Sequence, residues 1–254
     1  MNTLRKFMAP LIAIALFLAG WEWLVWANGW PTYKMAAPSD LWPAFWKFRG
    51  LFLEYGWQTL WRTVAGLALA IVFGVGVGMV MGFSRTVRDG IYPLLVGFNA
   101  VPKATVVPIL ALMFVGQHDM NTILVAFMIS FFPIAVSVSI GLSTLEPEYR
   151  DILRSLGASQ LTVFWKIALP KTLPEFFGAL KVSVTLAFIG TNLMEIISPH
   201  GRGLGALFDS GKISSDYPLM FAVLIALALL GIVLYYIVVA LEKTFAGWAE
   251  RAPT

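Results

Sequence analysis

The sequence predicts an all-α protein that crosses a membrane about six times. Of its 254 residues, 59% are hydrophobic and only 13% are charged, which is about half the charged share of a soluble domain. Several uninterrupted apolar runs approach or exceed the roughly 18–20 residues that a helix needs to cross a bilayer. Because these runs do not alternate apolar and polar residues with a period of two, they are not strands.

Six apolar runs are predicted spans, and an even number places both termini on one side of the membrane. Basic residues are more numerous at the termini and on the connections that share their side, which favours the cytoplasm for both ends. The first run continues past Gly20 into a tryptophan cluster without a small-x-small cleavage site, so we expect an uncleaved membrane helix. The predicted spans are residues 7–27, 60–83, 91–115, 122–142, 176–197 and 218–241.

Composition also limits the chemistry of the chain. Cysteine is absent, and the two histidines, His118 and His200, have no neighbouring residues at metal-ligand spacing. We therefore expect no metal site. The net charge is +4, and the basic residues lie at the ends of the apolar runs, where they determine membrane topology. We therefore expect no nucleic-acid partner. Clustered intramembrane acids or histidines, the signature of a membrane-embedded enzyme, are missing, so we do not expect an enzyme.

The predicted organisation is one membrane domain, 1–254, with two segments outside the lipid. Residues 28–58 mix tryptophan, proline and charge, and we expect them to lie along the outer surface, partly as an interfacial helix in contact with lipid. The alternative for this segment is a contact with an external partner. Residues 144–171 form a charged connection, and the charge rule places them in the cytoplasm.

Small residues recur every four positions through the second predicted span. This spacing aligns them along one face of a helix, where they allow another helix to approach closely. The fragment GVGVG lacks the spacing and the preceding strand of a dinucleotide-binding loop, so we expect helix packing. The stripe consists of Gly66, Ala70, Gly74, Gly78 and Gly82.

Polar residues inside two other spans are candidates for a translocation path. Lys103 lies among three prolines in the third span, where it either caps a broken helix end or faces the route of an anionic solute. Thr191, Asn192 and Glu195 occupy the outer half of the fifth span and either line a cavity or make interhelical hydrogen bonds. We expect Lys181, nearer the cytoplasm, to extend its ammonium group to the interface.

The cytoplasmic fragment EPEYRDILRSLG predicts a short amphipathic helix. Tyr149, Ile152, Leu153 and Leu156 share one face, and Gly157 ends the helix. A helix of about ten residues is marginal in water, so another surface must cover its apolar face. That surface is either the rest of this chain with its lipid, or a groove on a second protein.

The same fragment resembles the EAA loop of bacterial ABC importer permeases. Asp151-Ile152-Leu153 occupy the Glu-Ala-Ala-like triplet, with two bulky residues in place of small ones, and Gly157 occupies the glycine position. Ile167, Leu169 and Pro170 occupy the closing Ile-x-Leu-Pro pattern. Four further fragments resemble the nitrate/sulfonate/taurine-type subfamily. They are APSDLWPAF, VPKATVVPILALMFVG, FFPIAVSVSIGL and LMEIISPHGRGLGALF.

This resemblance implies a type I ABC importer permease fold in the bacterial inner membrane. It implies a coupling helix that docks on a separate cytoplasmic ATPase through the four apolar residues above, oriented by Asp151 and Arg154. It further implies a dimer of permeases and an extracytoplasmic solute-binding protein. No cofactor is expected on this chain, because GALFDSGKI departs from a Walker A motif and ATP and Mg²⁺ belong to the ATPase subunit.

The expected cargo is a small anionic solute of the nitrate, sulfonate or taurine class. Within the same permease role, the alternatives are thiamine or pyrimidine precursors, riboflavin and aromatic carboxylates. An alternative of another class is a secondary transporter or channel that uses no ATPase.

Overall fold

The structure is a computed structural model that describes residues 2–143, 162, 166, 168–198 and 201–248. All regular secondary structure in these ranges is helical apart from isolated turns, so the predicted all-α class is confirmed. The helices are α1 (Asn2–Ala27), α2 (Pro38–Lys47), α3 (Arg49–Phe83), α4 (Arg85–Ala100), α5 (Lys103–Met113), α6 (His118–Ser143), α9 (Leu169–Ile197), α10 (Leu204–Ile213) and α11 (Tyr217–Phe245).

Four of these helices, α3, α6, α9 and α11, are long and apolar enough to cross a membrane. The pair α4 and α5 supplies a fifth apolar passage, but it is bent by 87° between Ala100 and Lys103. Pro102 lies at the break, where its ring and missing N–H disfavour a continuous helix. α1 adds a shorter apolar stretch, Ile12–Ala27. These passages agree with the prediction of about six spans, with the third span broken.

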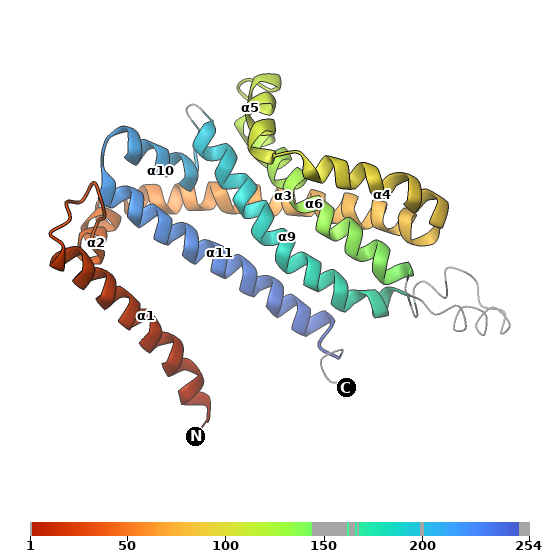
Figure 1. Ribbon diagram of the computed structural model, residues 1–254, viewed down its shortest axis with the longest axis horizontal. Helices are drawn as coiled ribbons and strands as arrows, with labels where there is room; N and C mark the ends of the chain where they lie inside the picture. The colour runs from red at the N-terminus through yellow and green to blue at the C-terminus, as the bar shows by residue number, and fades with distance from the viewer. Residues whose placement is uncertain (1, 144–161, 163–165, 167, 199–200, 249–254) are drawn as a thin grey trace.

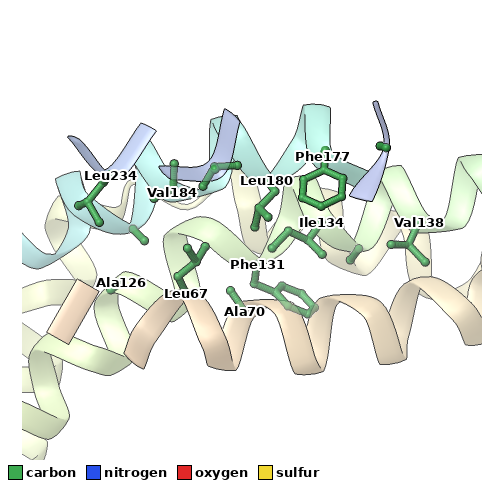
Figure 2. Packing of buried hydrophobic residues seen from close by; sticks show 14 of the residues in the cluster. Leu67, Ala70, Ala126, Phe131, Ile134, Val138, Phe177, Leu180, Val184 and Leu234 are labelled. Atoms are coloured by element: carbon green, nitrogen blue, oxygen red, sulfur yellow. The ribbon is translucent and has the colours of Figure 1, made fainter. Parts of the chain in front are cut away.

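The core lies where α3, α6 and α9 run side by side, with α11 against α9 (Figure 1). Figure 2 shows its side chains filling the space between these helices. Leu67 and Ala70 come from α3, Phe131 and Ile134 from α6, and Leu180 from α9. Large apolar side chains elsewhere on the long helices stay exposed, as expected of surfaces that face lipid.

The small-residue stripe of α3 lies directly against α6. A Cβ added at Gly66 would lie 2.5 Å from the Cβ of Ala126, and one at Gly74 would lie 2.9 Å from the Cβ of Ile134. At Gly78 the added atom would lie 2.7 Å from the carbonyl oxygen of Ala135. The two backbones therefore approach closely along the length of the stripe, and side chains at these positions would separate them.

The segment 28–58 contains α2 and the beginning of α3, which starts before the predicted second span. Leu41 and Ala44 of α2 are buried, while Trp42 and Trp46 are exposed and stack on each other. α2 is therefore amphipathic, with an aromatic outer face of the kind found at membrane interfaces. Its position relative to the membrane surface stays a prediction.

Candidate functional site

A buried carboxylate lies near the end of α9, at the end of the bundle where α6 and α10 begin. Glu195 is 1% exposed. Its Oε2 accepts a hydrogen bond from the Thr59 hydroxyl at 2.8 Å and from the Gly205 backbone N–H at 3.1 Å. The Nη1 group of Arg62 lies 3.2 Å from its Oε1. A carboxylate at this depth requires such partners, and here they come from α3 and from the first turn of α10.

The guanidinium of Arg62, which comes from α3, contacts three other parts of the chain. Besides its ion pair with Glu195, its Nη1 donates to the backbone carbonyl of Arg202. Its Nε donates to Oδ1 of Asp119, the second residue of α6, at 2.8 Å. The side chain of Arg62 is only 4% exposed, so its charge depends on these neighbours rather than on water.

The same cluster fixes the start of α10. The Thr59 hydroxyl accepts a hydrogen bond from the Leu204 N–H at 2.8 Å while it donates to Glu195. Two N–H groups in the first turn of α10 therefore donate to side chains of α3 and α9. In most helices a side chain just before the first turn accepts such bonds. Gly203 precedes them with φ 142°, and a Cβ at Gly203 would overlap the Glu195 carboxylate. Only glycine fits both the backbone angle and the space.

The three polar residues predicted in the outer half of the fifth span have different surroundings. Thr191 is buried, and its hydroxyl bonds to the hydroxyl of Thr63 on α3 at 3.0 Å. Asn192 donates to the Phe188 carbonyl of its own helix, and its buried Oδ1 has no hydrogen-bond partner. Thr191 and Glu195 therefore make interhelical bonds of the kind that the sequence left open. A part in lining a translocation path stays a prediction for all three.

A polar pocket of about 440 Å³ opens beside this cluster. Arg62 and Asp119 are among its lining residues, as is Arg202, whose side chain is 68% exposed. His118 is held against α9 by a 2.7 Å contact between its Nδ1 and the Ser198 hydroxyl. The pocket is lined by Gln58, Arg62, Gly116, Gln117, His118, Asp119, Met120 and Arg202.

The two carboxylates that contact Arg62 are bound unequally. Glu195 is buried, and removing one partner of a buried pair costs about 3–5 kcal/mol because a desolvated charge is left behind. The Asp119 side chain is 57% exposed and can be solvated if it leaves Arg62. Because Arg62 itself is buried, its pair with Asp119 lies between the exposed and the buried cases. Glu195 is therefore the buried partner of Arg62, and Asp119 is the partner that water can reach.

The two lysines of the predicted spans both have protein partners. Lys103 donates to the carbonyl oxygens of Phe98, Asn99 and Val101 at 2.8–3.2 Å, around the end of α4 where carbonyls lack helical partners. These contacts match the helix-end interpretation, while a part in solute passage stays a prediction. Lys181, for which we expected an interfacial ammonium, forms a 2.8 Å ion pair with Glu242 of α11.

Most of the predicted docking residues lie outside the described residues. Leu169 and Pro170 are described and form the first turn of α9, a position that suits proline. The arrangement of the segment before them is not among the described parts, so its role stays a prediction. The residues concerned are Tyr149, Asp151, Ile152, Leu153, Arg154, Leu156, Gly157 and Ile167.

The residues predicted from the sequence did not include Arg62, Asp119, Thr59 or Thr63, although Thr59 bonds to Glu195 and Thr63 to Thr191. Arg62 carried a usable signal, because an arginine inside a predicted span requires a buried partner. The sequence carries no comparable signal for Asp119, because this residue precedes the predicted fourth span and resembles any acidic residue at the start of a helix. In the described ranges no three acidic or histidine side chains gather as possible metal ligands.

Comparison with known proteins identifies the family. Residues 66–247, most of the chain, match the family of binding-protein-dependent transport system inner membrane components. The chain belongs to this family. It is therefore a multi-pass ABC transport permease of the inner membrane and not an enzyme, in agreement with the resemblance drawn from the sequence.

Relatives of the permease have different named solutes. A formylaminopyrimidine transport permease of Halalkalibacterium halodurans is 31% identical over 201 residues, which cover 79% of this chain and 80% of that one. A riboflavin transport permease of Chloroflexus aurantiacus is 27% identical, with 97% and 94% covered. The taurine transport permease of Escherichia coli is 28% identical, with 76% and 70% covered. The taurine relative supports the resemblance drawn from the sequence.

Solved structures show the same fold. A chain of the methionine ABC transporter MetNI, in an inward-facing conformation, superposes with a TM-score of 0.66 at 17% identity. The match covers 78% of the permease and 98% of that chain. A second crystal form gives a TM-score of 0.64 at 18% identity. The predicted ABC importer permease fold is thereby confirmed.

Proposed function

We propose that the permease is the membrane-spanning subunit of an ATP-driven importer, in which two copies line one solute path. The observation that carries this proposal is the family match over residues 66–247, joined to the fold shared with an ABC importer. Both termini lie in the cytoplasm, as the distribution of basic residues favours. The chain binds no ATP itself, and an ABC ATPase subunit supplies the energy.

Residues 146–157 dock on that ATPase as a coupling helix. The apolar face of this short helix needs a cover, and a groove on the ATPase provides it. α9 begins at Leu169, soon after the docking segment, and carries Glu195 near its far end. A displacement of the docking segment therefore acts on the helix that holds the buried cluster.

The proposed cargo is a small anionic solute, delivered by an extracytoplasmic binding protein. The basic side chains of Arg62 and Arg202 at the polar pocket support an anion. A second candidate is a neutral or weakly charged heterocycle, because relatives named for formylaminopyrimidine and riboflavin match the chain at similar identity. We assign Lys103, which is partly exposed at the bend between α4 and α5, to the path.

Uptake into proteoliposomes tests this function. The permease is reconstituted with its ATPase and binding protein, and uptake of radiolabelled taurine, riboflavin and formylaminopyrimidine is measured. We expect uptake of one solute that requires both ATP and the binding protein. Uptake that persists without ATP and follows an ion gradient would instead identify a secondary transporter.

A further inference from the structure

We propose that the polar pocket beside Arg62 binds the acidic group of the solute, a carboxylate or sulfonate, which replaces Asp119 as the partner of Arg62. The solute class rests on the proposed function. The site itself rests on the arrangement of six polar side chains around a cavity of about 440 Å³, a size suited to a small molecule. These side chains are Gln58, Arg62, Gln117, His118, Asp119 and Arg202.

The guanidinium of Arg62 is already held in position for an anion. Its Nη1 group is bonded to Glu195 and to the carbonyl of Arg202, which fixes the plane of the fork. The Nε and Nη2 groups point to the Asp119 carboxylate, with Nε 2.8 Å from Oδ1. This edge of an arginine matches the paired oxygens of carboxylates and sulfonates. An anion that takes the place of Asp119 therefore finds two donors without rearrangement of Arg62.

Asp119 can leave this position more readily than Glu195 can. Its side chain is 57% exposed, so its carboxylate can turn to water, whereas Glu195 is 1% exposed and has no such alternative. Glu195 continues to neutralise Arg62 from behind, so the exchange leaves the buried ion pair intact. Asp119 thus acts as a resident anion that a solute displaces.

Arg202 supplies further donors at the pocket edge. Its side chain is 68% exposed, and its Nη1 lies 3.9 Å from the Glu54 carboxylate, too far for a hydrogen bond. Because its backbone carbonyl is bonded to Arg62, the residue stays beside the pocket while its guanidinium remains free to turn. Two arginines therefore line the pocket, and Asp119 carries the one carboxylate among its lining residues.

Replacing Asp119, the carboxylate that now pairs with Arg62, tests the proposal, because the expected change in affinity has a definite direction. The assembled transporter in nanodiscs is titrated calorimetrically with methanesulfonate, an anion with no amino group, and with neutral methanesulfonamide. We expect Asp119→Asn to tighten methanesulfonate binding by about three- to fivefold, the effect of losing one competing exposed charge, and to leave methanesulfonamide unchanged. Arg202→Gln should weaken methanesulfonate binding by a similar factor. Both positions are exposed, so both variants are expected to fold.

Asp209→Asn is the matched control. Asp209 lies on α10 at the same end of the bundle and carries the same charge, but it does not line the pocket. Equal binding by the wild type and Asp119→Asn, or an equal gain in Asp209→Asn, overturns the site. Absence of methanesulfonate binding in all forms also overturns it. Tighter methanesulfonate binding in Asp119→Asn alone supports the site. This result does not depend on the uptake assays, so a neutral cargo found there would contradict only the solute assignment.

Discussion

The guanidinium of Arg62 and the carboxylate of Glu195 are 133 positions apart in the sequence and 3.2 Å apart in the fold. Both side chains are buried, so each charge is stabilised by the other, and Glu195 also accepts hydrogen bonds from the Thr59 hydroxyl and from the Gly205 N–H at the start of α10. Through this pair α3, α9 and α10 meet at one point. The pair is therefore structural as well as adjacent to the proposed solute site.

Glu195→Ala should destabilise the permease strongly. It leaves Arg62 without its buried counterion and removes the acceptor for the Gly205 N–H, at a cost of about 3–5 kcal/mol. Apparent thermal unfolding midpoints of the purified protein in detergent measure the loss. Glu54→Gln is the control, because Glu54 is 52% exposed and lies 3.9 Å from its partner. Similar midpoints for the two variants would contradict the structural role of Glu195.

Gly74→Ala and Gly76→Ala should have opposite effects although they lie two residues apart on α3. A Cβ at Gly74 meets Ile134 of α6 at 2.9 Å, so the substitution separates the helices at a cost of about 1–3 kcal/mol. A Cβ at Gly76 meets nothing within 4 Å, and alanine is favoured over glycine in a helix by up to about 1 kcal/mol. Unfolding midpoints measure both. A Gly74→Ala protein as stable as Gly76→Ala would show that α3 and α6 tolerate separation.

Features that depend on neighbouring residues could be predicted from the sequence, and features that depend on contacts between distant residues could not. The stripe around Gly74 and the break at Pro102 were predictable, because both depend on local periodicity and on backbone chemistry. The partner of Glu195 was not, since its identity depends on the packing of helices distant in sequence. Arg62 lay within a predicted span as an unexplained charge, and pairing two such intramembrane charges of opposite sign would have found the ion pair.

The ion pair between Lys181 and Glu242 should couple α9 to α11. The two side chains are 26% and 17% exposed, so water screens them only partly. We expect Lys181→Met or Glu242→Gln alone to lower stability by about 1–2 kcal/mol, and the double variant to lose less than the sum. A double-mutant cycle on unfolding midpoints measures this coupling. Additive losses would mean that the 2.8 Å contact contributes nothing to stability.

Gly157→Trp tests the proposed coupling helix. If Gly157 ends that helix at the ATPase groove, an indole there displaces the docking face, and a loss of about 1.4 kcal/mol of binding free energy weakens assembly tenfold. We expect reduced copurification with the ATPase, or ATP hydrolysis without solute uptake. Gly56→Trp is the control, because a Cβ at Gly56 meets nothing within 4 Å and α3 begins at the end of the bundle opposite the first turn of α9. A Gly157→Trp protein that copurifies and transports normally would refute the docking assignment, because no such groove could then enclose this position.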